Sequence, residues 1–230
     1  MTPQLPLALR FPPDQRLDAF VGQADVRALV EQSARGERED WLYLAGPAGS
    51  GKTHLLLAAC AEAQQRGETS AYLPLATMAG RLGDALVGAE RSALVCLDSL
   101  EAIAGHRGDE EALFHFHNRA RAADCRVIYA AQAMPSALPL SLPDLRSRLE
   151  QCTRLSLDAL DESGRRLVLR RRAERRGLEL DDAVLDFLFR RVGRDLGGLT
   201  ALLDRLDRES LAAQRRITVP FLKRFVTETP

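Results

Sequence analysis

Gly46-Pro47-Ala48-Gly49-Ser50-Gly51-Lys52-Thr53 is a complete G-x-x-x-x-G-K-T loop, and it decides how the rest of the chain is interpreted. An apolar run at residues 41–45 precedes the loop, and a helix-like run at residues 54–60 follows it. This strand-loop-helix setting is the context in which the motif cradles phosphates. A glycine-rich turn that arose by chance is the alternative, and it explains neither the spacing nor the flanking segments.

The residue types of this loop suit the binding of nucleotide phosphates. Glycines allow the backbone to point successive N–H groups at one anion, and the helix that starts here adds its positive dipole end. Lys52 carries a full charge for the β- and γ-phosphates, and the Thr53 hydroxyl is a natural Mg²⁺ ligand. The residues expected to hold ADP or ATP are Gly46, Pro47, Ala48, Gly49, Ser50, Gly51, Lys52, Thr53 and His54.

Strand-like and helix-like segments alternate around the loop. Strands are expected at residues 41–45, 70–73, 92–98 and 126–131, and helices at 24–33, 54–60, 78–86 and 109–124. This alternation predicts an α/β fold in which helices flank a parallel sheet. From residue 158 the sequence becomes charge-rich with amphipathic spacing, which predicts a small C-terminal α-helical lid.

Asp98 ends the expected strand at residues 92–98, where a carboxylate can reach a Mg²⁺ ion held beside Thr53. Many ATPases place a second acid directly afterwards to orient the attacking water, but here Ser99 follows. Glu101 lies two places further on, and a water-activating role for it is the less favoured alternative. Gln132, at the end of the strand at 126–131, is interpreted either as a γ-phosphate sensor or as a neutral loop residue.

Arginines are frequent in this chain, so their position must decide what they do. Arg148 could stabilise charge on a transferring phosphoryl group, but residue chemistry alone favours a surface ion pair. Arg194, in the expected lid, could reach over the phosphates or lie in solvent, and the two alternatives are equally open. The runs at residues 170–172 and 175–176 predict a solvated helix face.

Length and charge limit the class of protein. The 230 residues suffice for one α/β domain with a smaller appendage. The 32 basic residues balance the 32 acidic ones, so no overall basic field marks nucleic acid as the main partner. His115 and His117 are two places apart on an expected helix and therefore do not share a metal ion.

The cysteines and the N-terminus indicate a reducing compartment. Cys60, Cys96, Cys125 and Cys152 are far apart and form no C-x-x-C pair, so we expect reduced thiols in the core. Neither a signal peptide nor a membrane-spanning run is visible. A cytoplasmic protein without membrane contact is the expectation.

Residues 1–19 are rich in proline and are expected to form an extended arm. Within them Gln4-Leu5-Pro6-Leu7-Ala8-Leu9 places alternating leucines beside a glutamine, which suits a peptide that docks into another protein's groove. An arm folded onto its own domain is the alternative, and the residues alone do not separate the two.

In order, these elements resemble an AAA+ ATPase module of the DnaA-like branch, and most closely the family of the DnaA-related regulatory inactivator, Hda. The resemblance covers nearly the full length. It rests on residues 4–9, on the strand that ends at Asp98, on the Leu-Pro-Asp-Leu-Arg-Ser-Arg-Leu segment at 142–149, and on residues 203–208 and 217–221. It implies an arm at 1–19, a nucleotide-binding domain at 20–157 and a lid at 158–230.

The resemblance also implies roles for individual residues. Arg148 matches the arginine finger that acts on a nucleotide held by a partner, and Arg194 matches the lid arginine that senses nucleotide. The expected contacts with a sliding clamp are Gln4, Leu5, Leu7 and Leu9. Ala8 departs from the clamp peptide, Gln132 replaces an acid, and Ser99 removes the acid that self-hydrolysis would use.

The implied function is negative regulation of replication initiation. With ADP or ATP and Mg²⁺ bound, and tethered to the DNA polymerase III sliding clamp on DNA, the chain would stimulate hydrolysis of ATP on the DnaA initiator. Its own ATPase activity would be weak at most, and it could form homo-oligomers. Since the sequence stops at Pro230 without a helix-turn-helix domain, sequence-specific DNA binding is not expected. A DnaA-like adaptor without stimulating activity and a self-standing ATPase or helicase loader are the alternatives.

Overall fold

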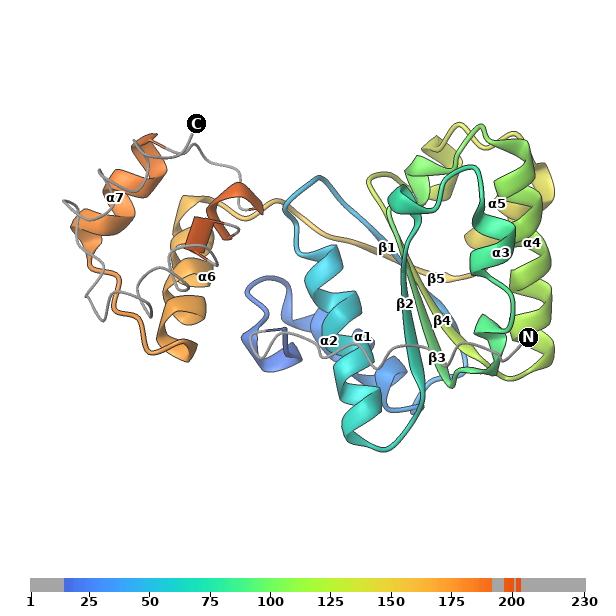
Figure 1. Cartoon of the computed structure of the whole chain (residues 1–230), viewed down its shortest axis with the longest axis horizontal. Coiled ribbons are helices and arrows are strands. Elements are labelled where there is room, and N and C mark those ends of the chain that lie inside the picture. Colours follow the sequence, from blue (N-terminus) through green and yellow to red (C-terminus); the bar gives the residue numbers. More distant parts are fainter. Residues whose placement is uncertain (1–14, 192–196, 201, 204–230) are drawn as a thin grey trace.

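A computed structural model describes residues 15–191, 197–200 and 202–203 of the chain. Its centre is a five-stranded sheet in the order β2-β3-β4-β1-β5, with every neighbouring pair parallel (Figure 1). The strands are β1 (Leu42–Ala45), β2 (Ser70–Pro74), β3 (Leu94–Asp98), β4 (Arg126–Ala131) and β5 (Thr153–Ser156). Because β4 lies between β1 and β3, its carboxyl end lies between the strand that leads into the phosphate loop and the strand that ends at Asp98.

Helices cover both faces of the sheet. On one face lie α1 (Ala24–Ala34) and α2 (Lys52–Gln65), and on the other lie α3 (Leu82–Ala85), α4 (Arg107–Ala122) and α5 (Pro143–Glu150) (Figure 1). Short 3-10 turns connect several of these elements, among them η1 (Leu17–Ala19) and η4 (Leu100–Ala102). The fold predicted from the alternation of segments, a parallel sheet flanked by helices, is confirmed.

Alternating strand side chains build the two cores. Tyr43, Leu97 and Tyr129 are buried toward α3, α4 and α5, whereas Leu44, Cys96 and Ile128 are buried toward α1 and α2. Residues that alternate along a strand point to opposite faces, so a strand buried on both sides is apolar throughout. This is why the strand sequences read as continuous hydrophobic runs.

The lid has a core of its own. Its helices α6 (Glu162–Arg175) and α7 (Asp182–Arg191) lie beyond α1 and α2, on the side away from the sheet (Figure 1). Leu169, Leu185 and Leu199 belong to a buried cluster that includes no residue of the sheet domain. Asp161 accepts the N–H of Gly164 at 2.7 Å and Asp181 that of Val184 at 2.7 Å, so each helix starts at a capping aspartate.

One glutamine joins the sheet domain to the start of the lid. The Gln23 side chain donates from Nε2 to the Ser156 carbonyl at 3.0 Å and accepts the Asp158 N–H at Oε1 at 3.1 Å. Asp18 adds an ion pair with Arg175 of α6 at 3.1 Å. These contacts fix the direction in which the chain leaves β5.

Two buried carboxylates at the beginning of α4 hold the loops around them. Asp109 accepts the N–H groups of Gly80 at 2.6 Å and Leu82 at 3.1 Å. Glu110 is fully buried and accepts the N–H groups of Gly105, Ser141 and Leu142, at 2.7, 3.0 and 2.7 Å. Burial raises the pKa of Glu110, but these N–H groups and the Ser141 hydroxyl outweigh it and lower the pKa overall.

Several sequence-based expectations differ from the structure in detail. Strand β5 was not expected, and the segment expected as a helix at 78–86 is helical only over α3. Leu17 packs into the core from η1, so the end of the expected extended arm is folded onto the domain. The four cysteines are buried and free, as predicted.

The described part of the chain holds no helix long and apolar enough to cross a membrane.

Candidate functional site

The phosphate loop runs from the end of β1 into α2. Gly51, the N-cap of α2, takes the left-handed φ of 94°, and a Cβ there would lie 2.7 Å from the Phe20 ring. A side chain is therefore excluded at this position both by the backbone and by the neighbouring ring. The first N–H groups of a helix have no intrahelical acceptor, so the start of α2 is a setting for an anion.

Lys52 is held within the loop itself. Its Nζ donates to the carbonyl oxygens of Gly46 at 2.6 Å and Pro47 at 2.8 Å. Burial lowers the pKa of Lys52, while the nearby carboxylates of Glu101 and Asp98 act in the opposite direction. The ammonium group thus lies among the backbone of the loop and faces two acids.

Asp98 is buried at the end of β3 and accepts hydrogen bonds from two hydroxyl groups. The Thr53 hydroxyl donates to Asp98 Oδ2 at 2.6 Å, and the Tyr72 hydroxyl donates to the same oxygen at 2.9 Å. Burial and the Asp98 charge raise the pKa of Tyr72 well above its usual value. A hydroxyl and a carboxylate at this separation fit Mg²⁺, which binds few protein oxygens and completes its shell with phosphates and water. The described segments hold no group of three or more histidine, cysteine, aspartate or glutamate residues that could bind a metal ion.

A cavity of about 570 Å³ lies above the phosphate loop. Its floor is the loop, one side is formed by the ends of β3 and β4, and the lid supplies Arg172 and Thr200. The predicted nucleotide residues Ala48, Gly49, Gly51, Lys52, Thr53 and His54 and the predicted metal ligand Asp98 all line it. The structure therefore brings together most of the nucleotide and metal residues that were expected to share a site.

Glu101 also lines this cavity, which the sequence argument did not favour. Ser99 adopts a left-handed conformation with φ of 62° and ψ of 50°, and the η4 turn follows it. This turn brings Glu101 back over the end of the sheet, where its Oε2 accepts the Gln132 N–H at 3.0 Å. The backbone of Gln132, rather than its side chain, makes this contact with the acid.

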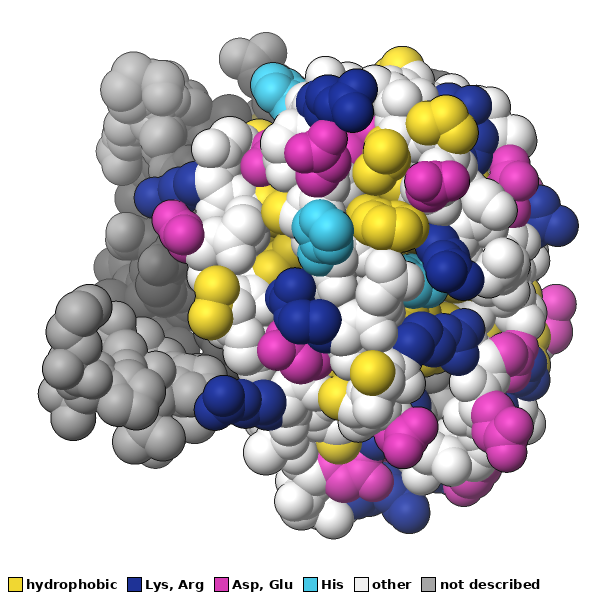
Figure 2. Space-filling view, turned by 90° about the vertical axis from the view of Figure 1, so that its right-hand side faces the viewer, with side chains coloured by type: hydrophobic (Ala, Val, Ile, Leu, Met, Phe, Trp, Pro, Cys, Tyr) yellow, Lys and Arg dark blue, Asp and Glu magenta, His cyan; other side chains and the backbone are white. Residues whose placement is uncertain are grey.

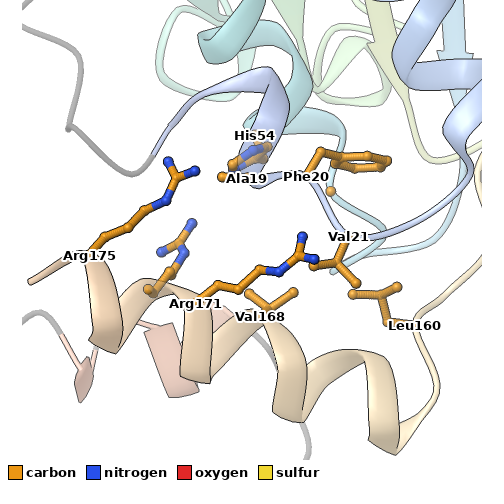
Figure 3. A pocket seen from close by; sticks show the side chains of 10 residues that line it. Ala19, Phe20, Val21, His54, Leu160, Val168, Arg171 and Arg175 are labelled. Carbon is orange, nitrogen blue, oxygen red and sulfur yellow. The ribbon is translucent and has the colours of Figure 1, made fainter. Parts of the chain in front are cut away.

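A second, mostly apolar pocket adjoins the cavity and shares Gly51, His54 and Arg172 with it. Phe20 and Val21 lie on one side and Leu160 and Val168 on the other. Figure 3 shows Arg171 and Arg175 extending from α6 toward the loop that carries Ala19 and Val21. An aromatic and aliphatic pocket next to a phosphate site suits the base and sugar of a nucleotide.

The arginine run of α6 was expected to be a solvated face. Arg171 and Arg175 are exposed, in agreement with that expectation, and Arg172 is half-buried, but all three also line the pocket opposite the phosphate loop. Helical periodicity places these three residues on one side of α6, and the position of the lid turns that side toward the loop. The direction in which this side of α6 faces depends on where the lid lies, and helical periodicity does not predict that position.

Arg148 lies apart from this site. It is exposed in the last turn of α5, lines neither cavity, and forms no ion pair with another described residue. With Arg121 it lowers the pKa of His117, after the larger effect of burial. Figure 2 shows the face built by α3, α4 and α5, on which acidic and basic side chains are interspersed. Arg194 and the arm residues Gln4, Leu5, Leu7 and Leu9 lie outside the described residues.

Together, the strand order, the phosphate loop after β1, the acid at the end of β3 and a helical lid over the loop define an AAA+ P-loop module. Residues 161–226 match the family model described as "Hda, lid domain". The lid segment of this chain is therefore similar to the Hda lid, and the solved structures below are similar to the chain in fold.

Solved structures of DnaA share the fold. Domain III of the Thermotoga maritima replication initiation protein DnaA matches with a TM-score of 0.75 at 21% identity, over 92% of this chain and 95% of that one. AMPPCP-bound DnaA from Aquifex aeolicus matches with a TM-score of 0.66 at 22% identity, over 86% of this chain. DnaA bound to AMPPCP and single-stranded DNA matches with a TM-score of 0.67 at 22% identity. The chain spans 66% of the length of each of these two initiators.

The sequence analysis missed three parts of the site. The Tyr72 hydroxyl on β2 donates to Asp98, and the Gln23 side chain donates to the backbone just before the lid. The Phe20 ring lies against Gly51 of the phosphate loop. Phe20-Val21-Gly22-Gln23 precedes the first helix, and its apolar pair next to a glycine is a signal that could have marked a binding segment. Tyr72 carried no comparable signal, because tyrosine is ordinary in a strand.

Proposed function

We propose that this chain is a negative regulator of DNA replication initiation that stimulates the hydrolysis of ATP bound to DnaA. In this proposal the chain acts with ADP bound and while tethered to the DNA-loaded sliding clamp. It is a nucleotide-binding regulator whose own hydrolysis is slow.

The position of Arg148 carries the proposal. An arginine that served the chain's own nucleotide would lie at the cavity, but Arg148 is exposed on α5 and is absent from the cavity lining. A guanidinium free to enter another molecule's active site can stabilise the transferring phosphoryl group, and such arginine fingers contribute a factor of about 10³ to 10⁵ in rate. The Hda-type lid and the DnaA-like fold support DnaA as the molecule that receives it.

The chain's own nucleotide would have a structural role. The phosphate loop and Lys52 would hold the phosphates, and Thr53 and Asp98 would hold Mg²⁺, which neutralises phosphate charge when bound. Phe20, Val168 and the α6 arginines would contact the base and sugar. Since these groups come from both the sheet domain and the lid, a bound nucleotide would fix their relative position.

The N-terminal arm would supply the second contact. Gln4, Leu5, Leu7 and Leu9 are proposed to bind the DNA polymerase III sliding clamp, as the family resemblance implies. Tethering would raise the effective concentration of a weakly binding regulator near DnaA without any new interface. Arg194, from the lid, is proposed to sense the nucleotide, and self-association of the chain is compatible with the proposal.

The test is the rate at which DnaA hydrolyses its bound ATP in the presence of clamp-loaded DNA. We expect the intact chain to accelerate hydrolysis, and we expect Arg148→Ala and the double variant Gln4→Ala, Leu5→Ala to lose the acceleration. Arg66→Ala, at the exposed end of α2, serves as a matched control that should retain it.

The other outcomes identify the alternatives. If the chain binds DnaA but does not change the hydrolysis rate, with or without Arg148, it is an adaptor and the stimulating role fails. If the chain hydrolyses ATP rapidly without DnaA, it is an ATPase in its own right.

A further inference from the structure

The apolar pocket beside the phosphate cavity is lined by an excess of positive charge. Three arginines of α6, Arg171, Arg172 and Arg175, line this pocket, and no carboxylate of the described residues does. In the phosphate cavity, by contrast, the carboxylates of Asp98 and Glu101 lie near the lysine of the loop. The more strongly positive part of the nucleotide site is therefore its lid end, away from the phosphate loop.

The contacts of these arginines leave guanidinium groups available to a ligand. Arg171 is exposed and forms no hydrogen bond or ion pair with another described residue. Arg175 forms an ion pair with Asp18 at 3.1 Å, but Asp18 does not line the pocket. Figure 3 shows both arginines extending from α6 toward the loop that carries Ala19 and Val21, across the space that a ligand would occupy.

An ordinary nucleoside diphosphate would not neutralise this charge. All of its negative charge is on its 5′-phosphates, and the loop and the start of α2 are suited to hold these. The base and the ribose, which fit the apolar pocket, are uncharged. A guanidinium can stack on a base, but one flat contact does not account for three cations around a single pocket.

We propose that this pocket binds a nucleotide that carries a phosphate on its ribose in addition to its 5′-phosphates, an inference that rests on the nucleotide site of the proposed function. A guanidinium binds phosphate oxygens through two parallel N–H donors, and such charge-assisted hydrogen bonds are about twice as strong as neutral ones. Phe20 on one side of the pocket and Val168 on the other limit the access of water, which strengthens these contacts. Arg171 supplies the guanidinium without a protein partner, and Arg175 supplies a second one.

The experiment compares the affinity of the full chain for ADP with its affinities for 3′-phospho-ADP and 2′-phospho-ADP, all with Mg²⁺. We expect the better of the two ribose-phosphorylated ligands to bind about tenfold more tightly than ADP, because it forms charge-assisted hydrogen bonds that ADP lacks. The two probes also show which ribose oxygen faces the arginines. If neither probe binds more tightly than ADP, the proposal is overturned.

Variants of Arg171 test where this preference arises. Arg171→Gln removes the charge and should reduce the preference to about threefold or less. Arg171→Lys should keep most of the preference, since an ammonium group also pairs with phosphate, although without the two parallel donors. Arg190→Gln is the matched control, because Arg190 is exposed on α7 of the same lid and lines neither pocket. It removes one positive charge and should keep the full preference.

The ratio of the affinities separates a contact with the ribose phosphate from other roles of the arginine. If Arg171→Gln lowers the affinities for ADP and for the preferred probe by the same factor, the arginine supports the lid or stacks on the base, and the proposal is overturned. It is also overturned if the full preference survives in Arg171→Gln. An equal loss of preference in Arg190→Gln would assign the effect to the overall charge of the lid and would likewise contradict a site at Arg171.

Failure of this proposal can be told apart from failure of the proposed function. If the preference is found but DnaA-bound ATP is hydrolysed no faster, the pocket retains its ligand and the regulatory function fails. If hydrolysis is accelerated but no preference is found, only the ribose-phosphate proposal fails. If none of the three nucleotides binds, the nucleotide site itself fails, and this proposal fails with it.

Discussion

At the scale of single residues, the site depends on side chains that orient other side chains. Asp98 is the clearest case, because Thr53 and Tyr72 donate hydroxyl groups to the same oxygen from α2 and from β2. Thr53 belongs to the phosphate loop and lines the cavity, but Tyr72 does not line it. Its contribution is therefore to hold the carboxylate in place.

Replacing Tyr72 with phenylalanine should weaken Mg²⁺ binding by the nucleotide complex about tenfold, because groups that orient a metal ligand have effects of this size. The measurement is ADP titration at a series of Mg²⁺ concentrations. In EDTA the variant and the unaltered chain should bind ADP equally well. A similar loss with and without Mg²⁺ would mean that Tyr72 supports the fold of β2 instead.

His117 makes stability depend on pH. It is buried on α4, lies 3.0 Å from the Tyr129 hydroxyl and packs edge-on against Trp41, and burial lowers its pKa to about 4. In the unfolded chain its pKa is near 6.5, so below that pH the unfolded state binds a proton that the folded state does not. Folding stability should therefore fall as the pH decreases from about 6.5 toward 4, by at most about 3 kcal/mol from this group.

Urea unfolding at pH 7 and pH 5 tests this expectation. His117→Gln should be less stable at both values but should lose less stability between them than the unaltered chain. His115→Gln, two places away and exposed, should keep the full pH dependence. Equal pH dependence in all three chains would contradict the assignment.

At the scale of elements, Glu110 joins the start of α4 to the η4 loop and to the segment before α5. It binds the N–H group that ends the η4 loop and two N–H groups that precede α5. The η4 turn carries Glu101, and α5 carries Arg148. One buried carboxylate thus links the phosphate cavity to the helix proposed to act on DnaA.

Glu110→Gln should expose the beginning of α5. The amide retains one acceptor oxygen but presents N–H groups where N–H groups already point, and we expect a loss of about 2 to 4 kcal/mol in the free energy of unfolding. Hydrogen exchange should accelerate in residues 141–145, while the neighbouring Glu111→Gln, which is more exposed, should leave them unchanged. Protection that is unaltered in Glu110→Gln would rule out this role.

At the scale of the whole molecule, polar contacts join the described part of the lid to the sheet domain. Gln23 pairs with the backbone on both sides of Leu157, and Asp18 pairs with Arg175. The exposed ion pair contributes little by itself, within about 0 to 1 kcal/mol. We therefore expect the glutamine to dominate the position of the lid.

Gln23→Ala should loosen the start of the lid without unfolding either part. ADP affinity should fall about three- to tenfold, because the lid supplies part of the pocket. ADP would then have to order the loosened lid, and the entropy lost in that ordering would weaken binding. Limited proteolysis should cleave faster between residues 156 and 161. Gln64→Ala, exposed near the end of α2, should change neither affinity nor cleavage. Normal affinity in Gln23→Ala would show that the lid is held by other contacts.

The sequence predicted the parts of this structure that depend on local pattern. The phosphate loop, four of the strands, and Asp98 at a strand end follow from periodicity and motif spacing, because each is encoded within a short stretch. Strand β5 was missed, since Thr153–Ser156 is short, sits at the sheet edge and alternates only weakly. Glu101 lines the cavity because Ser99 adopts a left-handed conformation, and the arginine side of α6 faces the phosphate loop because of where the lid lies. Neither feature could be predicted from local sequence pattern.

The separate core of the lid has a thermodynamic consequence. Because no described residue of the sheet domain belongs to its buried cluster, we expect the lid to melt as a cooperative unit of its own, and calorimetry should record two transitions. A ligand whose site is formed by the lid and the sheet domain together binds only while both are folded. It therefore stabilises each part only while the other part is folded. Saturating ADP should therefore raise the lower melting temperature toward the higher one until a single heat-absorption peak remains, so that heat capacity would report how firmly the nucleotide joins the two halves.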